Sequence, residues 1–470
     1  MGKVALVGAG CGNLDLYTVR AIELISTCDC LVYDSLIDNE IIEKTKEDCE
    51  RIFVGKRANH HALPQEEINQ LLVNKSKEYA LTVRLKGGDV YVFGRGGEEG
   101  EELFKNQVEF EVVPGVSSCT GGLAYAGIPI THRGVSGGFQ VYTSQLRSNQ
   151  ERAFDFTKML DDYCTYVFLM GIRKLEMIVN GFLEAGKHPK TPIAIVSNAS
   201  LAKQKTLVST LDHMVQDFNN HPLPMPGIIV VGNVVNMRQY LNFFETKPLF
   251  GKNILVTVVG NDHMLTKALR QQGANVQEVQ TGSIEYVDIE LPSLEGTFVF
   301  TSKHGVIGFM KAYKKQYQDV RKLANVKIVA IGEKTNACLQ EYGLCADMIP
   351  SDWNSDSLQQ ECALDDAVWF TADIAHAKIN CKKKLIVYRN VECTIMEEIG
   401  HYDYALFTCA SSVERFKKQN DSSISTFISI GKFTTKAVKA CYGDVNIIET
   451  NVASKEAMLE CMIGGVKDVL

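Results

Sequence analysis

Residues 3–34, KVALVGAGCGNLDLYTVRAIELISTCDCLVYD, hold the pattern that decides the fold of the first part of the chain. KVALVGAG predicts a strand, LDLYTVRAIELIS has the spacing of an amphipathic helix, and CDCLVYD predicts a second strand. The alternation continues with a helix at PQEEINQLLVNKSKE and a strand at ALTVRLKGG. Strands that alternate with helices form parallel sheets, so we predict an α/β fold.

The glycine turn after the first strand is similar to a dinucleotide-binding turn. That motif requires G-x-G-x-x-G, because its third glycine lets the helix approach the strand. Gly8, Gly10 and Gly12 give G-x-G-x-G instead, and Asn13 stands where the third glycine is required. No second dinucleotide feature accompanies this turn, so we interpret it as a glycine turn that does not bind NAD.

The composition indicates a soluble globular protein of several domains. The chain has 470 residues, 45% of them hydrophobic and 22% charged. No apolar run reaches the roughly 18 residues of a membrane span, so we expect a cytoplasmic protein without a membrane partner. A net charge of −7 argues against a general nucleic-acid partner. The 14 cysteines contain no C-x-x-C pair, so we expect free thiols and no metal.

Changes in composition and an internal repeat predict the domain organisation. PGVSSCTGGLAYAGIPITHRG (114–134) is glycine-rich, and FFETKPLFGKN (243–253) has the proline and glycine of a linker. GTFVFTSKHGVIGF followed by VKIVAIGEKT returns later as YALFTCASSVERF followed by STFISIGKFTT, which indicates a duplicated unit. We predict a two-lobed α/β domain at 1–243 (lobes about 1–134 and 135–243), a linker at 244–252, and a second two-lobed α/β domain at 253–470 (lobes about 253–355 and 356–470).

Further motifs follow the opening turn in order: VYDSLI, FVGKR, RLKGGDVYVFGRGGEE, and VPGVSS with AYAGIPITHRG. Over about residues 1–243 this series resembles the uroporphyrinogen-III C-methyltransferases of the tetrapyrrole methylase family. The resemblance implies that S-adenosyl-L-methionine lies folded in a cleft between two α/β lobes that are not a dinucleotide-binding fold. It also implies a homodimer formed through this domain.

The same resemblance assigns residues to the methylation site. Asp34 corresponds to the proton acceptor and Lys56 to the proton donor. A methylated pyrrole carbon must lose a proton, which gives a positioned carboxylate a use. The two glycines before Asp89 let a ligand approach the backbone. The residues matched to binding of S-adenosyl-L-methionine are Cys11, Gly87, Gly88, Asp89, Val92, Ser117, Ser118, Met170 and Ala199.

Basic residues near these motifs suit a substrate that carries eight carboxylates. Cationic side chains bind carboxylates through charge-assisted hydrogen bonds. From the residues themselves we expect Arg57, Arg95, His132 and Arg133 to contact the substrate.

The second half of the chain resembles uroporphyrinogen-III synthase through FTSKHGV, VAIGEKT, VYRNVE, FTCASS and ISIGKFTTKA. The resemblance implies closure of the linear tetrapyrrole hydroxymethylbilane, with inversion of its last ring, in a cleft between two lobes. It assigns loss of the leaving hydroxyl to Tyr388. It places Ser302, Thr335, Cys409 and Thr434 along the cleft.

The chain departs from both patterns at single positions. Cys11 and Asn13 replace the proline and aspartate of the methylase turn, and Val90 replaces the proline that usually follows the KGGD motif. Cys409 stands where a serine is more usual. Replacing a proline with cysteine frees a φ angle and removes a ring that could contact a ligand.

Together the resemblances predict a bifunctional enzyme that makes uroporphyrinogen III and methylates it twice to precorrin-2, toward sirohaem or cobalamin. Two alternatives stay open. In one, the second half is a module that binds tetrapyrroles without closing the ring. In the other, the first half is a methylase of the same fold with another acceptor, such as a protein histidine or ribosomal RNA.

Overall fold

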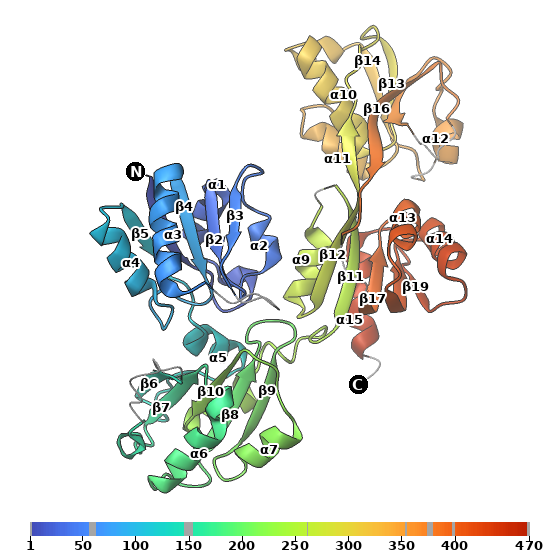
Figure 1. The fold of residues 1–470 in the computed structure, drawn as a ribbon. Helices are drawn as coiled ribbons and strands as arrows, with labels where there is room; N and C mark the ends of the chain where they lie inside the picture. The colour runs from blue at the N-terminus through green and yellow to red at the C-terminus, as the bar shows by residue number, and fades with distance from the viewer. Residues whose placement is uncertain are drawn as a thin grey trace. The chain divides into compact units, whose positions relative to one another are not determined.

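The computed structural model describes residues 2–55, 63–144, 154–260, 262–352, 355–373, 379–396 and 400–467. The chain forms two compact units, the first mainly Met1–Lys252 and the second mainly residues 253–468 (Figure 1). Both units consist of α/β lobes, as the alternation of strands and helices predicted. Within the described ranges, no helix is long and apolar enough to cross a membrane.

The first lobe is a five-stranded parallel sheet in the order β3-β2-β4-β1-β5. The strands are β1 (Lys3–Gly8), β2 (Cys30–Tyr33), β3 (Glu50–Phe53), β4 (Leu81–Lys86) and β5 (Phe110–Val113). The helices are α1 (Val19–Thr27), α2 (Asn39–Ile42), α3 (Gln65–Glu78) and α4 (Gly96–Lys105). Ala5 and Val7 pack on one face with α1, whereas Val4 and Leu6 pack on the other with α3 and α4. Both faces are covered, which explains the continuous apolar runs.

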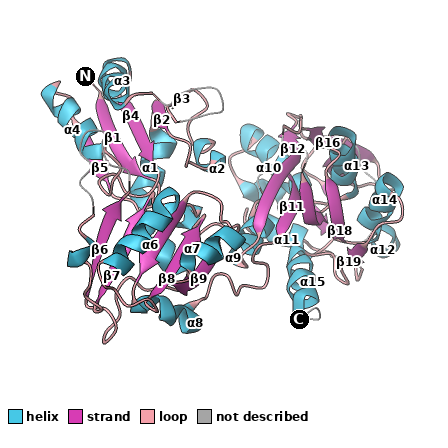
Figure 2. Cartoon of the chain, turned by 60° about the horizontal axis from the view of Figure 1, so that its bottom comes forward, coloured by secondary structure: helices cyan, strands magenta, loops and turns pink. Residues whose placement is uncertain are grey.

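The second lobe is a mixed sheet in the order β6-β7-β10-β8-β9, in which β6 and β7 are parallel and the other neighbours antiparallel. The strands are β6 (Gly138–Thr143), β7 (Cys164–Leu169), β8 (Pro192–Ser197), β9 (Lys205–Thr210) and β10 (Gly227–Val231). Helices α6 (Leu175–Glu184) and α7 (Met214–Asn220) cover one face (Figure 2). A short helix, α8 (Arg238–Leu241), follows the last strand.

The glycine-rich segment that we expected to end the first lobe packs against the second sheet instead. A π-helical turn (Ser118–Gly122) and α5 (Leu123–Tyr125) place Cys119, Leu123 and Ile128 on the face opposite to α6. These side chains pack against the apolar residues at alternate positions of β7, β8 and β10. The connection between the lobes is therefore part of the second core, because it supplies the cover for that face.

The second unit is built on one nine-stranded sheet in the order β14-β13-β15-β16-β12-β11-β17-β18-β19. The strands are β11 (Asn253–Val259), β12 (Asn275–Tyr286), β13 (Gly296–Phe300), β14 (Val326–Ala330), β15 (Val368–Ala372), β16 (Lys383–Glu392), β17 (His401–Phe407), β18 (Ser423–Ser429) and β19 (Ile447–Glu449). The helices are α9 (Met264–Gln271), α10 (Lys303–Gln316), α11 (Glu333–Gln340), α12 (Ser355–Glu361), α13 (Ala410–Gln419), α14 (Lys432–Tyr442) and α15 (Lys455–Lys467).

The predicted duplication is confirmed in the backbone. The order β13-α10-β14-α11 is repeated as β17-α13-β18-α14, and both strand pairs are parallel. The residues that precede the first helix of each copy, Ser302 and Cys409, have nearly the same dihedral angles, with φ of −160° and −161°. The two copies thus place equivalent residues at equivalent helix starts.

The lobe boundary that we predicted near residue 355 is wrong. Strands β15 and β16 pair beside β13, whereas β11 pairs with β17. The β13 lobe therefore comprises β13 to β16 with α10 to α12, and the β17 lobe comprises β11, β17, β18 and β19 with α9 and α13 to α15. The long antiparallel pair β12 and β16 joins them (Figure 1). The repeat shows which segments are equivalent, but not which sheet edge the remaining strands join.

Candidate active sites

The loops that follow β1, β4 and β5 meet at the carboxyl ends of these strands, where glycines let the backbones touch. Gly88 N–H donates to Gly10 O at 2.6 Å, and Gly10 N–H donates to Gly88 O at 3.1 Å. Gly115 approaches so closely that an added Cβ would lie 2.1 Å from the Gly88 oxygen. Gly88 has a φ of 73° and open space where a side chain would begin, so a ligand can approach it. The neighbouring Gly87 faces Leu36, which follows β2.

Asp89 holds this edge together through its carboxylate. Its Oδ1 accepts hydrogen bonds from the N–H groups of Tyr91 at 2.8 Å and Val92 at 3.1 Å, and its Oδ2 accepts one from Gly115 at 3.0 Å. A carboxylate has about four acceptor positions, and the backbone uses three of them here. Asp89 thus shapes the loop, a role that the sequence did not indicate, and the Val92 side chain stays partly exposed beside it.

A serine of the second lobe fastens the opening turn. Ser200 Oγ donates to Cys11 O at 3.1 Å and accepts from Asn13 N–H at 3.0 Å, and its side chain is buried. The neighbouring Ala199 is also buried, with its carbonyl oxygen 3.0 Å from the place where a Cβ on Gly12 would lie. Burial raises the pKa of the Cys11 thiol, so Cys11 presents an uncharged surface at neutral pH. Sequence reasoning missed Ser200, although it stands in the SNAS motif beside Ala199.

The turn does not open onto a helix of the first lobe. Asn13 caps a single 3₁₀ turn (Leu14–Leu16) by accepting from Asp15 N–H at 2.9 Å, and α1 begins only at Val19, capped by Thr18. A dinucleotide site needs a helix N-terminus directly after the glycines, because that terminus holds the pyrophosphate. The strand order also differs from the 3-2-1-4-5-6 order of dinucleotide-binding sheets.

Strained backbone gathers at the facing edge of the second lobe. Met170, Asn198 and Ser200 have φ values of 56°, 47° and 66°, in the left-handed region that residues other than glycine rarely adopt. Such positions persist where the surrounding structure imposes them and cluster at functional sites. Met170 exposes 44% of its surface. Ser117 caps the π-helical turn that begins at Ser118, and both serines are close in sequence to Gly115.

A buried charge cluster lies in the first lobe, between β4 and α4. Glu99 Oε1 accepts from Lys86 Nζ at 2.7 Å and from Arg84 Nε at 3.2 Å, and all three side chains are buried. Arg84 Nη2 also lies 3.9 Å from Asp34 Oδ2, at the end of β2. Burial, followed by the charge of Arg84, lowers the pKa of the Lys86 ammonium. The cluster links the KGGD motif, the GRGGEE motif and the predicted proton acceptor Asp34.

The remaining residues predicted for the first unit lie in different settings. Lys56 and Arg57 lie outside the described residues. Arg95 directly precedes α4, with a φ of 60°, and forms an ion pair with Glu98 at 2.7 Å. His132 and Arg133 occupy an exposed turn that is closed by hydrogen bonds between His132 and Ser136, and among the described residues neither forms a hydrogen bond or ion pair with the glycine loops.

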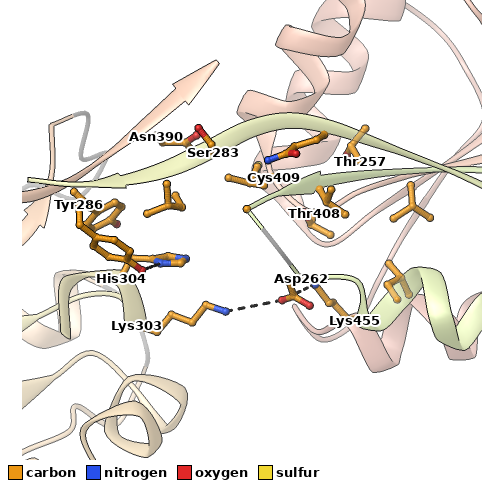
Figure 3. A pocket seen from close by; sticks show the side chains of 18 residues that line it. Thr257, Asp262, Ser283, Tyr286, Lys303, His304, Asn390, Thr408, Cys409 and Lys455 are labelled. Atoms are coloured by element: carbon orange, nitrogen blue, oxygen red, sulfur yellow. Dashed lines mark hydrogen bonds and ion pairs between the residues drawn. The ribbon is translucent and has the colours of Figure 1, made fainter. Parts of the chain in front are cut away.

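The second unit contains a cavity of about 670 Å³ that residues of both lobes line (Figure 3). Its size suits a ligand larger than a simple metabolite. Of the residues predicted there, Tyr388 and Cys409 line the cavity. Thr335 and Thr434 are buried within α11 and α14 and do not line it. The lining residues that sequence reasoning missed include Thr257, Asp262, Tyr286, Lys303, His304 and Lys455.

Tyr388 lies in a small polar group at one end of this cavity. Its hydroxyl is hydrogen-bonded to the Ser302 hydroxyl at 3.0 Å, and Ser302 also caps α10. Burial raises the pKa of the Tyr388 phenol, so the phenol keeps its proton at neutral pH. Tyr286 is the register partner of Tyr388 across β12 and β16, and its hydroxyl is hydrogen-bonded to His304 Nδ1 at 3.1 Å. Burial and the nearby Lys303 lower the pKa of His304 to about 4.

Comparison with known proteins matches two families to successive segments of the chain. Residues 3–215 match the Tetrapyrrole (Corrin/Porphyrin) Methylases, and residues 263–460 match Uroporphyrinogen-III synthase HemD. Porphyrin biosynthesis protein HemD of Ruminiclostridium josui is 36% identical over 93% of this chain and 93% of its own length. The uroporphyrinogen-III C-methyltransferase of Bacillus subtilis is 34% identical over 75% of this chain and 74% of its own. A siroheme synthase of Psychrobacter cryohalolentis is 40% identical over 53% of this chain and 47% of its own.

Replacing Gly115 tests the backbone contact. In Gly115→Ala the added Cβ meets backbone atoms, which cannot turn away, so the loops must separate. We expect a loss of about 1–3 kcal/mol of local stability and faster hydrogen exchange at the amides of Gly10 and Gly88, measured by mass spectrometry. Gly97→Ala in α4 is the control, because its Cβ would meet nothing within 4 Å. Unchanged exchange in Gly115→Ala would show that the contact does not fix the loops.

Two adjacent glutamates test the buried cluster. Glu99→Gln leaves Lys86 and Arg84 without a buried counter-charge, so we expect a loss of about 3–5 kcal/mol, measured by urea unfolding followed by far-ultraviolet circular dichroism. Glu98→Gln removes an exposed partner of Arg95 and should cost at most about 1 kcal/mol. Equal effects of the two substitutions would contradict the assignment of a buried ion cluster.

His304 gives the second unit a defined pH dependence. The unfolded ring takes up a proton near pH 6.5, whereas the folded ring does so only near pH 4. The unfolded state therefore binds more protons in this window, and the free energy of unfolding should fall as the pH drops from about 6.5 to about 4. Tryptophan fluorescence reports this unit, because Trp369 lies on its strand β15 and residues 1–252 contain no tryptophan.

The His304→Gln variant should flatten that part of the pH profile. Substitution of the exposed His401 by glutamine should leave the wild-type slope, since His401 lies on the surface of the β17 lobe. A wild-type slope in His304→Gln would contradict the buried, neutral state of the ring.

Proposed function

Because the chain belongs to the family of porphyrin biosynthesis proteins, we propose that it is a bifunctional enzyme with one activity in each unit. The second unit closes hydroxymethylbilane to uroporphyrinogen III, and the first methylates that product twice with S-adenosyl-L-methionine to give precorrin-2. The observation that carries the proposal is that one chain matches a tetrapyrrole methylase and a uroporphyrinogen-III synthase in successive segments.

The first unit has features that suit S-adenosyl-L-methionine. The open backbone at Gly88 admits a polar chain, and the exposed side chains of Val92 and Met170 offer apolar surface to a purine ring. The uncharged thiol of Cys11 adds to that surface. Ser117 and Ser118 supply backbone and hydroxyl groups next to Gly115. When bound, S-adenosyl-L-methionine supplies an electrophilic methyl group.

In this proposal Asp34 takes the proton that the methylated pyrrole carbon releases. Its carboxylate stands at the carboxyl end of β2, where ligand sites of parallel sheets gather. Leu36 N–H donates to Asp34 Oδ1 at 3.1 Å, and Arg84 lies 3.9 Å from Oδ2. These two partners hold the carboxylate in one orientation. Lys56 keeps the role of proton donor, and Arg57 and Arg95 that of substrate contacts, as proposals.

In the second unit Tyr388 assists the loss of the hydroxyl from hydroxymethylbilane. That hydroxyl leaves as water with the proton that the neutral phenol donates, and the phenolate is protonated again by the proton that a pyrrole carbon releases on ring closure. The raised pKa of Tyr388 keeps the phenol protonated, and Ser302 fixes its direction. His304 is neutral at pH 7, so it does not compete as a cation for the leaving oxygen. Cys409 contributes a weakly polar wall to the cavity.

We further propose that the product enters the sirohaem branch, which the similarity to a siroheme synthase favours over the cobalamin branch. The similarity covers 53% of this chain and 47% of the siroheme synthase.

Single substitutions separate the two activities. We expect Tyr388→Phe to slow ring closure by about 10- to 100-fold while the methylation of preformed uroporphyrinogen III stays unchanged. Asp34→Asn should slow methylation by about 100-fold and leave ring closure intact. Both reactions are followed by chromatography and mass analysis of the oxidised products. The control is Tyr317→Phe, in the same lobe but away from the cavity.

The outcomes distinguish the candidates. Loss of methylation in Tyr388→Phe would contradict the assignment of one activity to each unit. Binding of hydroxymethylbilane by the wild type without ring closure would favour a second unit that only binds tetrapyrroles. Methyl transfer to ribosomal RNA or to a protein, in place of uroporphyrinogen III, would favour the other methylase.

A further inference from the structure

An ion pair crosses the cavity of the second unit. Asp262 follows β11 of the β17 lobe, and its Oδ2 lies 2.8 Å from Nζ of Lys455, the first residue of α15. The same oxygen lies 3.9 Å from Nζ of Lys303, the first residue of α10 in the β13 lobe. Figure 3 shows Lys303 pointing across the cavity toward Asp262. One carboxylate therefore stands between two ammonium groups from opposite lobes.

These three residues carry the charge of the cavity lining. Lys303 and Lys455 are its lysines, and Asp262 is the one carboxylate among the lining residues of the described structure. His304 stays neutral at pH 7, because burial and Lys303 lower its pKa to about 4. The Lys455 ammonium lowers the pKa of Asp262, so that carboxyl is ionised. Two positive charges thus face one negative charge, and the cavity favours an added anion.

The ion pair between Lys303 and Asp262 is weak enough to exchange. Lys303 and Asp262 expose 53% and 41% of their side chains, and ion pairs in such settings contribute about 1 kcal/mol or less. A ligand that carries several carboxylates can replace the Asp262 carboxylate at Lys303 without a large loss of free energy. Its other contacts then supply the affinity.

We propose that Lys303 and Lys455 form a carboxylate-binding subsite that spans the two lobes, and that Asp262 occupies it until a side-chain carboxylate of the linear tetrapyrrole takes its place. This subsite rests on the proposed function for the identity of its ligand. It lies close to Tyr388, because His304 follows Lys303 and its ring centroid is 5.5 Å from that of the Tyr388 ring. A carboxylate held there ties both lobes to one end of the substrate.

The exchange predicts opposite effects of neighbouring substitutions. Lys303→Gln and Lys455→Gln remove a partner of the substrate, whereas Asp262→Asn removes its competitor. We expect the lysine variants to weaken binding by about three- to tenfold and Asp262→Asn to strengthen it by about two- to fivefold. Lys303→Arg keeps the charge and should retain most of the affinity.

The full-length protein is titrated with uroporphyrin III, a stable octacarboxylate, and binding is followed by porphyrin fluorescence. Binding to the first unit is common to all variants, so differences between them report the second unit. Lys315→Gln is the control, since Lys315 lies on the same helix as Lys303 and pairs with Asp288 outside the cavity. In parallel, KM for hydroxymethylbilane should change in the same direction as the dissociation constant, with kcat within about twofold.

Weaker or unchanged binding in Asp262→Asn would overturn the proposal, as would lysine variants that behave like Lys315→Gln. Failure of the wild type to close hydroxymethylbilane would instead contradict the proposed function. The uroporphyrin titration would still decide whether the two lysines bind carboxylates.

Discussion

The paired hydrogen bonds between Gly10 and Gly88 are the constraint on which the site of the first unit depends. They bring the ends of β1 and β4 together, and Gly115 closes the third side without a side chain. Asp89 and Ser200 then hold the loops through backbone groups. Because Ser200 bonds to the carbonyl of Cys11 and the amide of Asn13, the contact does not depend on the side chains at which this turn departs from the methylase pattern.

In the second unit, backbone pairing between two strands also positions the residues of the cavity. The chain passes between its lobes through the antiparallel strands β12 and β16, which carry Tyr286 and Tyr388 as register partners. Arg415 of α13 fixes this ribbon to the β17 lobe, with bonds of 2.7 Å to Asn390 Oδ1 and 2.9 Å to Asn390 O. Tyr388 thus stands on the segment that joins the lobes, while Lys303 and Asp262 approach from either side. Motion of one lobe against the other would change these distances together.

Much of this arrangement follows from the sequence. The alternation of strands and helices, the duplication and both family resemblances are confirmed, because each rests on local patterns that survive in one chain. The lobe boundary near residue 355 was wrong, since pairing between β11 and β17 joins segments about 150 residues apart that no local pattern connects. The same limit explains why Lys455 was missed: it meets Asp262 only after the sheet has formed. Ser200 was missed because its role depends on a backbone fold of the opposite lobe.

The central claim is that one polypeptide performs two successive reactions on a tetrapyrrole. The most direct measurement is a single incubation of the purified wild type with hydroxymethylbilane and S-adenosyl-L-methionine that carries an isotopic label in its methyl group. Products are resolved by isomer and by mass. The account predicts a macrocycle with the inverted last ring and two labelled methyl groups. A macrocycle without the inversion, or without label, would contradict it.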